Sequence, residues 1–299
     1  MNLGISVDTG RARAVVADAG GVVVARGESA AGSMPDAVTG AVRAALSGAP
    51  GARPLAVGLS VPDPDISSHP SDLSFLFAAI GETVPVRTLG CGAASALGEV
   101  LFGSERGARH LVAFSIDPSV SAGVISNGAL LSGAHGLAGS VQWMSLNPVE
   151  REDYRRMGCL EAESSAAGIV RRFVWRIKSG DRSSVTAAAG GDLNAITLEM
   201  ILNGARDNDG VSVSVVRDTI RYIAMAVSNI AAVVDPDVIV LGGILELSAA
   251  LLLEPIRQEC ARRLPPGIHS RARIEASTLG ADAAPLGAAR FAQLGSQLP

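Results

Sequence analysis

A cysteine, Cys91, lies at the start of the small-residue segment LGCGAASALGE, residues 89–99, where a strand is expected to end and a helix to begin. A thiol in such a place acts as a nucleophile only when a neighbouring histidine or positive charge lowers its pKa. The sequence pairs no histidine with Cys91, and an unperturbed thiol, with a pKa of about 8.5, is a poor proton acceptor at neutral pH. We therefore expect a small side chain that packs at the beginning of a helix, and no catalytic residue at this position.

Glycine-containing turns after apolar strands provide a second kind of chemistry, because their backbone N–H groups can approach a phosphate. One such turn contains Asp8 and Gly10, and another is formed by Gly242 and Gly243. The first turn carries a carboxylate, which repels an anion. The second is equally suited to close packing of a strand against its neighbours.

The candidate residues belong to two successive series of predicted elements. Short apolar runs separated by turn residues predict three strands within residues 3–29, and apolar residues at helical spacing predict a helix over 34–46. Residues 110–142 repeat the strand pattern, and a helix-rich region follows over 158–234. The repetition indicates an internal duplication in an α/β protein. Ligands of such proteins bind beyond the carboxyl ends of the strands, in the cleft between the lobes.

The composition limits the class of protein. Hydrophobic residues make up 48% of the 299 residues but aromatic ones only 3%, so we expect a core built from Ala, Val, Leu and Ile. The net charge of −4 argues against nucleic-acid binding, which needs a positively charged surface. No apolar run reaches the roughly 18 residues of a membrane span, and no secretory leader is present. The three widely spaced cysteines predict no disulfide framework, so a cytoplasmic protein is expected.

The order of the motifs resembles the ROK family, which contains bacterial sugar kinases and sugar-responsive repressors. The opening segment LGISVDTGRARAVVADAGGVVVARG is similar to the family's phosphate-loop hairpin, and VGLSVPDPD is similar to its Gly-x-x-x-Pro-Gly strand and loop. The other matching segments are AASALGEVLFGSERG, SAGVISNGALLSGAHGLAGS, GCLEAESSAAGIVRR, DPDVIVLGGIL and LGADAAPLGAA. The resemblance therefore runs almost from end to end of the chain.

The resemblance implies an α/β fold of the duplicated, actin-like or ribonuclease H-like kind, with two lobes and a central cleft. We expect an N-terminal lobe of residues 1–107 plus 281–299 and a C-terminal lobe of residues 108–280. Because the lobes of this scaffold commonly dimerise, a homodimer is also expected. His135 then lies in a turn or on the dimer face.

The resemblance also identifies the position of the catalytic base. In the family's kinases an Asp within a Glu-Asn-Asp-Ala-Asn loop accepts the proton of the sugar hydroxyl as that hydroxyl attacks the γ-phosphoryl group. This loop corresponds to residues 89–93, and the Asp position is Cys91. We expect that the proton-transfer site has been abandoned.

Both phosphate loops differ from those of the kinases. The family's Asp-x-Gly-Gly-Thr corresponds to the stretch from Ser6 to Gly10, with Asp8 where a phosphate would lie. In the second loop, SIDPSVSAG, Asp117 adds a negative charge and Pro118 lacks a backbone donor. Because these carboxylates repel the phosphates, we expect neither ATP nor magnesium to bind. The resemblance implies that the candidates for the nucleotide side of the site are Asp8, Gly10, Gly242 and Gly243.

The family's zinc motif is changed as well. Its histidine position is Trp143, and its first two cysteine positions are Glu152 and Tyr154, so that Cys159 alone is kept. One thiolate does not form a four-coordinate structural site. We therefore expect no zinc and a charged surface loop over residues 147–158.

The sugar contacts are replaced at Gly90, Ala93 and Ser140, whereas Glu161 is retained in kind. Trp143 presents a large rigid surface, which either stacks on a ligand or fills the space of the missing zinc module. The candidate ligand-binding residues are Asp63, Ser140, Trp143 and Glu161.

The retained scaffold and the altered site together favour a non-catalytic, ligand-sensing or regulatory ROK domain with a sugar-like effector. It would be the effector domain of a transcriptional regulator whose winged-helix, DNA-binding part is absent from this chain. Two alternatives stay open. One is a ROK sugar kinase that phosphorylates a hexose with ATP through an unusual active site, and the other is a ligand-free dimeric scaffold.

Overall fold

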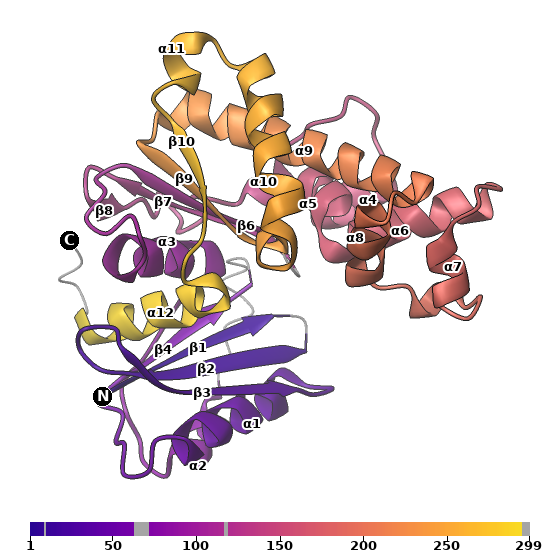
Figure 1. The fold of residues 1–299 in the computed structure, drawn as a ribbon. Helices are drawn as coiled ribbons and strands as arrows, with labels where there is room; N and C mark the ends of the chain where they lie inside the picture. Colours follow the sequence, from indigo (N-terminus) through magenta and orange to yellow (C-terminus); the bar gives the residue numbers. More distant parts are fainter. Residues whose placement is uncertain (9, 63–71, 117–118, 295–299) are drawn as a thin grey trace.

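A computed structural model describes residues 1–8, 10–62, 72–116 and 119–294. The predictions for Asp63, Asp117 and Pro118 therefore lie outside the described residues. Two mixed five-stranded sheets and the helices around them form two lobes (Figure 1).

The first sheet has the strand order β3-β2-β1-β4-β5. The strands are β1 (Asn2–Asp8), β2 (Arg11–Ala17), β3 (Val23–Ala30), β4 (Val57–Val61) and β5 (Val86–Gly90). The first three strands form an antiparallel meander, and β4 and β5 continue the sheet in parallel with β1. The carboxyl ends of β1 and β4 therefore meet at one edge of this sheet.

The second sheet repeats this topology in the order β8-β7-β6-β9-β10. The strands are β6 (Leu111–Ile116), β7 (Val120–Ser126), β8 (Ala129–Leu130), β9 (Val238–Gly243) and β10 (Arg273–Ala276). The first three are again antiparallel, and β9 and β10 run parallel to β6. The same strand order in both sheets confirms the predicted internal duplication and the actin-like fold class.

Helices join the strands and extend the second lobe to one side (Figure 1). The first lobe contains α1 (Met34–Ser47) and α2 (Ser74–Ile80). The helical region between the β7–β8 hairpin and β9 is α4 (Glu152–Met157), α5 (Cys159–Ser164), α6 (Ala166–Lys178), α7 (Ser184–Ala188), α8 (Leu198–Arg206) and α9 (Gly210–Val234). The last helices are α10 (Ile244–Arg263), α11 (Pro266–His269) and α12 (Ala283–Leu294), and α3 (Cys91–Phe102) precedes the second sheet.

Two of these helices, α3 and α12, cross between the sheets. Helix α12 packs on β1 and β4, and α3 packs on β6 and β7. Glycines allow the close approach, because an ideal Cβ on Gly58 of β4 would lie 1.8 Å from the Ala288 carbonyl oxygen of α12. The predicted lobe boundary after residue 107 stays a prediction, and α3 belongs by its packing to the second sheet.

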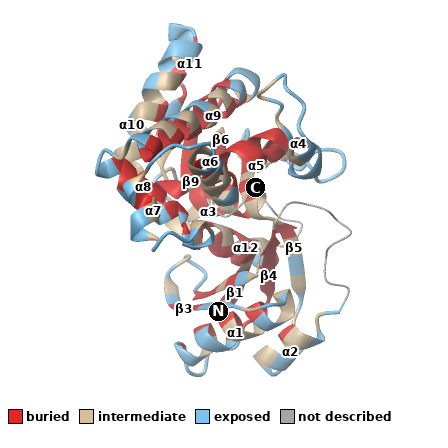
Figure 2. Cartoon of the chain, turned by 90° about the vertical axis from the view of Figure 1, so that its right-hand side faces the viewer, coloured by how far each residue is buried: buried red, intermediate tan, exposed pale blue. Residues whose placement is uncertain are grey.

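The interior is made of aliphatic side chains, as the composition predicts. On β1, Leu3, Ile5 and Val7 are buried, and α1 covers the meander with the buried face Ala37, Val38, Ala41, Val42 and Ala45. Burial is greatest on the inner strands β1, β4, β6 and β9 and on one face of α12 (Figure 2), whereas the outer strands β3 and β10 carry exposed residues. No helix in the described part of the chain combines the length and the apolar character needed to cross a membrane.

Candidate active site

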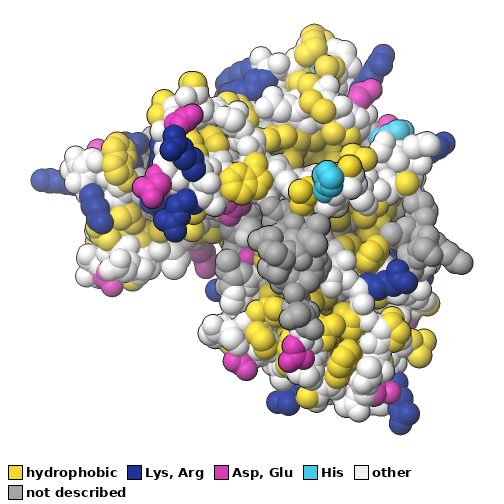
Figure 3. All heavy atoms as spheres, turned by 180° about the vertical axis from the view of Figure 1, so that it is seen from behind, with side chains coloured by type: hydrophobic (Ala, Val, Ile, Leu, Met, Phe, Trp, Pro, Cys, Tyr) yellow, Lys and Arg dark blue, Asp and Glu magenta, His cyan; other side chains and the backbone are white. Residues whose placement is uncertain are grey.

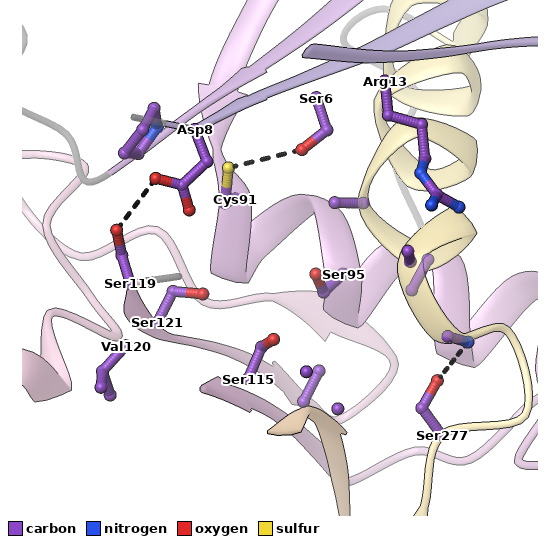
Figure 4. Close-up of a pocket in the computed structure, with 18 of the residues that line it drawn as sticks. Ser6, Asp8, Arg13, Cys91, Ser95, Ser115, Ser119, Val120, Ser121 and Ser277 are labelled. Atoms are coloured by element: carbon purple, nitrogen blue, oxygen red, sulfur yellow. Dashed lines mark hydrogen bonds between the residues drawn. The ribbon is translucent and has the colours of Figure 1, made fainter. Parts of the chain in front are cut away.

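A cavity of 850 Å³ lies between the two lobes. It opens at the carboxyl ends of β1, β6 and β9 and at the first turns of α3, where the two duplicated units face each other (Figure 4). A volume of this size is typical of a pocket for a small molecule or cofactor. The lining residues that matter below are Asp8, Cys91, Glu99, Ser119, Trp143 and Glu161.

Cys91 is the first residue of α3 and is partly exposed to this cavity. Its Sγ lies 3.2 Å from the Ser60 hydroxyl oxygen and 3.8 Å from that of Ser6. Ser60 donates a hydrogen bond to Ser6 at 3.2 Å, and the two serines occupy paired positions of the parallel strands β4 and β1. The thiol thus lies among hydroxyl groups at the beginning of a helix. That it is not a nucleophile stays a prediction.

Two carboxylates are held by the turn that begins β7. The Ser119 hydroxyl donates to Asp8 Oδ1 at 3.0 Å, and the Val120 backbone N–H donates to Glu161 Oε2 at 2.5 Å. Asp8 comes from the first lobe and Glu161 from α5 of the second. Adjacent residues of one turn therefore bring carboxylates from both lobes to the same part of the cavity. Figure 4 shows the contact between Ser119 and Asp8.

The other candidate residues lie around this centre. Trp143 lines the cavity and is 53% exposed, so its ring is free to face a ligand. Ser140 is not among the described lining residues, and its hydroxyl donates to the Leu137 carbonyl at 2.8 Å. Gly242 and Gly243 lie at the end of β9, where a Cβ on Gly243 would meet the Ile116 carbonyl oxygen at 2.2 Å.

Glu99 is the buried carboxylate of the cavity wall, with only 1% of its surface exposed. Ser277 donates its hydroxyl to Glu99 Oε1, whereas Oε2 is buried without a hydrogen-bond partner among the described residues. Burial raises the pKa of Glu99, and the negative charges of Glu105 and Glu246 raise it further, although the Ser277 hydrogen bond lowers it. The ionised form of this side chain is therefore costly in the folded protein.

We expect Glu99→Gln to stabilise the protein at neutral pH. The pKa of Glu99 in the folded protein lies above the ordinary value of 4.5. Below pH 4.5 the carboxyl group is therefore protonated in both states and does not lower the free energy of unfolding. As the pH rises from 4.5 through the folded pKa, ionisation favours the unfolded state and the free energy of unfolding falls. Urea unfolding of both proteins between pH 4 and pH 8 measures this, with exposed Glu82→Gln as the control. A stability difference that is independent of pH contradicts the expectation.

The comparison with known proteins decides the family. The model of the ROK family matches residues 83–294, which is more than half of the chain. The chain belongs to the ROK family. Together with the duplicated topology, this confirms both the family and the fold that the motifs predict.

The similar ROK proteins include kinases. Glucokinase of Halalkalibacterium halodurans is 29% identical over 195 residues, which cover 64% of this chain and 59% of that protein. Glucokinase of Streptomyces coelicolor is 27% identical over 98% of both chains. A solved ROK glucokinase of Streptomyces griseus, in complex with glucose and AMPPNP, has a TM-score of 0.81 at 23% identity and covers 98% of this chain and 99% of its own.

The expectation of a non-catalytic regulatory domain is wrong. Transcriptional regulators are present among the similar ROK proteins. However, one protein named glucokinase matches 64% of this chain and another matches 98% of it. The expectation gave most weight to single altered positions, whereas the comparisons reflect the whole chain. The predicted homodimer is not tested by these comparisons and stays a prediction.

The residues at the ROK zinc positions do not fit zinc. Trp143, Glu152 and Tyr154 stand beside a single buried thiol, Cys159, and no group of three His, Cys, Asp or Glu side chains in the described ranges could hold a metal. The segment predicted as a loop over residues 147–158 contains the helix α4, and it is held by Glu163 of α5. Tyr154 donates to Glu163 Oε1 at 2.5 Å.

Two arginines complete this ion cluster around Glu163. Arg151 donates to Oε1 at 3.1 Å, and Arg172 lies 3.2 Å from Oε2, with its guanidinium group 5.5 Å from the centre of the Tyr222 ring. Acidic and basic side chains are interspersed on this side of the second lobe (Figure 3). The charged loop that the sequence predicts is thus tied to the helices by a buried carboxylate.

Sequence reasoning missed several residues of the site. Ser6, Ser60 and Ser119 supply the hydroxyls around Cys91 and Asp8, and Glu99 forms the buried wall. Serines near the ends of two successive buried strands were a usable signal for the first two. Nothing in the local sequence indicates that Ser119 reaches the end of β1.

Proposed function

We propose that the chain is a sugar kinase, which transfers the γ-phosphoryl group of ATP to a hydroxyl of a hexose bound between the lobes. The observation that carries this proposal is the 850 Å³ cavity at the carboxyl ends of strands from both sheets, with carboxylates and hydroxyls on its walls. A full-length similarity to a protein named glucokinase supports it. The matched part of the first relative is only 59% of that protein, so the assignment rests on the cavity as well as on the name.

In this proposal the sugar binds near Glu161 and Trp143. A carboxylate fixed by a backbone N–H, as Glu161 is, can accept hydrogen bonds from sugar hydroxyls with its remaining lone pairs. The exposed ring of Trp143 offers an apolar surface to the C–H face of a pyranose. These two residues supply the polar and the apolar contact that a hexose needs.

The proposed nucleotide site lies near Gly242, Gly243 and the beginning of α10, because a helix N-terminus favours phosphates. The Gly243 N–H donates to Glu246 at 3.3 Å, so the phosphates would have to displace this carboxylate or use the neighbouring N–H groups. The negative charge of Asp8 is compatible with this placement. ATP enters kinase sites together with magnesium ions, which neutralise much of the phosphate charge. Zinc has no part in the proposed enzyme, because the Glu163 ion cluster holds the loop that zinc would otherwise order.

The test is hexose-dependent ADP release by the purified full chain with magnesium-ATP and a panel of hexoses and N-acetylhexosamines. We expect turnover with at least one of these sugars. For Glu161→Gln we expect the KM for that sugar to rise about tenfold to hundredfold, since a hydrogen bond to a charged group contributes roughly 1.5–3 kcal/mol.

The matched control is Glu150→Gln, which changes an exposed carboxylate outside the cavity and should leave the KM unchanged. Thermal unfolding of both variants checks that neither substitution destabilises the fold. Absence of ADP release with every sugar contradicts the proposed function.

A further inference from the structure

A kinase that phosphorylates a hydroxyl needs a group that takes the hydroxyl proton, and a carboxylate is the usual one. The first residue of α3 points into the cavity but carries a thiol, which accepts protons poorly. If the chain is the kinase proposed above, on which this inference rests, the proton must go to another side chain of the cavity.

Five carboxylates line the cavity among the described residues: Asp8, Glu28, Glu99, Glu161 and Glu246. Three of them have partners at other parts of the cavity wall. Glu28 forms an ion pair with Arg13 at 2.5 Å. Glu246 accepts the Gly243 N–H at 3.3 Å within the first turn of α10, and Glu99 is buried behind the Ser277 hydroxyl. Asp8 and Glu161 remain near the beginning of α3 and the β7 turn.

Each of these two side chains accepts a hydrogen bond from the turn that begins β7, and the two donors differ in a way that matters for proton transfer. Glu161 accepts a backbone N–H of Val120, a donor that is fixed in direction and suited to anchoring a ligand. Asp8 accepts the Ser119 hydroxyl at 3.0 Å, a donor that can rotate away and reorient when the carboxylate takes a proton.

Asp8 also lies beside the position that carries the thiol. Cys91 Sγ is 3.7 Å from the carbonyl oxygen of Val7, the residue before Asp8. Figure 4 shows the Asp8 carboxylate and the Cys91 thiol next to each other, with the carboxylate turned toward Ser119. A carboxylate at the end of β1 thus reaches the same part of the cavity as a side chain at the start of α3.

We infer that Asp8 is the general base of this enzyme, so that the carboxylate has moved from the beginning of α3 to the end of β1. The O–H bond of the sugar hydroxyl breaks and its proton passes to the Asp8 carboxylate. The hydroxyl oxygen forms a bond to the γ-phosphorus of ATP as the bond from that phosphorus to the β–γ bridging oxygen breaks. The products are the sugar phosphate, ADP and a protonated Asp8, which then loses its proton to water.

The experiment uses the full chain and the sugar that supports turnover. Asp8→Asn should lower kcat by about 10²- to 10⁴-fold, the usual contribution of a general base, while the KM values for sugar and magnesium-ATP change less than about threefold. The double variant Asp8→Asn with Cys91→Asp should regain at least about tenfold of the lost kcat, because it returns a carboxylate to the same space. The control is Asp18→Asn just after the far end of β2, where the carboxylate accepts the turn N–H groups of Gly20 and Val22.

The outcomes separate the inference from the proposed function. A wild-type chain that turns over sugar while Asp8→Asn keeps its kcat overturns the role of Asp8 and leaves the kinase intact. A variant that raises the KM for magnesium-ATP at unchanged kcat also overturns it, because Asp8 would then act only in nucleotide binding. A wild-type chain without phosphoryl transfer contradicts the proposed function and the role of Asp8 together.

Discussion

Glu163→Gln will lower the free energy of unfolding by about 3–5 kcal/mol, the usual cost of removing one partner of a buried ion pair. The Glu163 side chain is 7% exposed and accepts from Tyr154, Arg151 and Arg172. A glutamine carries no charge and has only one acceptor oxygen. It leaves the guanidinium group of Arg172, whose side chain is 15% exposed, without a full counter-charge.

Burial already lowers the pKa of Arg172, and the Glu163 carboxylate acts in the opposite direction. Burial, the hydrogen bond to Glu163 and the charge of Glu163 raise the pKa of Tyr154, so the phenol stays protonated and donates at all moderate pH values. The ion cluster therefore depends on the charge of Glu163 and not on that of the tyrosine.

Urea unfolding measures the effect, with an unchanged m value showing that the transition itself is the same. The control is Glu150→Gln, which breaks an exposed ion pair with Arg155 and should cost less than about 1 kcal/mol. If Glu163→Gln costs no more than this control, the cluster does not hold the loop in place of zinc.

Gly287→Ala will destabilise the protein by about 3 kcal/mol and will disturb the cavity between the lobes. Gly287 lies in α12 where that helix crosses α3, and an ideal Cβ would be 1.8 Å from the Ala94 carbonyl oxygen and 2.7 Å from the Gly98 nitrogen. Both contacts are backbone atoms, so no side chain can rotate to make room. The two helices must move apart.

Helix propensity alone would predict the opposite effect on stability, because it favours Ala over Gly by about 1 kcal/mol in a helix interior. Because α12 packs on the first sheet and α3 on the second, their separation also changes how the strand ends face the cavity. Unfolding free energy and the kcat/KM for sugar should fall together. The control is Gly210→Ala in α9, where a Cβ meets nothing within 4 Å. A Gly287→Ala protein as stable as wild type would show that the helix crossing adapts.

Local patterns predict much of this fold. The apolar strands of β1 and β9, the helical spacing of α1 and the repeated strand pattern depend on which neighbouring residues are apolar, and that information is contained in short segments. The duplication and the family follow from the order of such segments. The helix-rich region 158–234 was predicted as one stretch, and the structure divides it into α5 to α9, because capping residues such as Ser165, Thr197 and Asp209 begin new helices within it.

The site was predicted less well, for a physical reason. The phosphate-loop motif by itself predicts that Asp8 repels ATP, and this prediction contributes to the wrong expectation of a non-catalytic domain. In the structure Asp8 accepts a hydrogen bond from Ser119, which is 111 positions away along the chain. The chemical role of a carboxylate depends on such partners, and a motif does not contain them.

The sequence by itself thus determined the two duplicated units, the aliphatic core, the ROK scaffold and the change of residue types at the base and zinc positions. Only the tertiary structure decided which side chains surround these positions. Asp8, Ser119 and Cys91 meet where the two sheets face each other, and Glu163 gathers Arg151, Tyr154 and Arg172 from separate helices and the loop. Apolar periodicity is local and can be recognised in a segment, whereas hydrogen bonds and ion pairs between distant segments exist only after the lobes have packed.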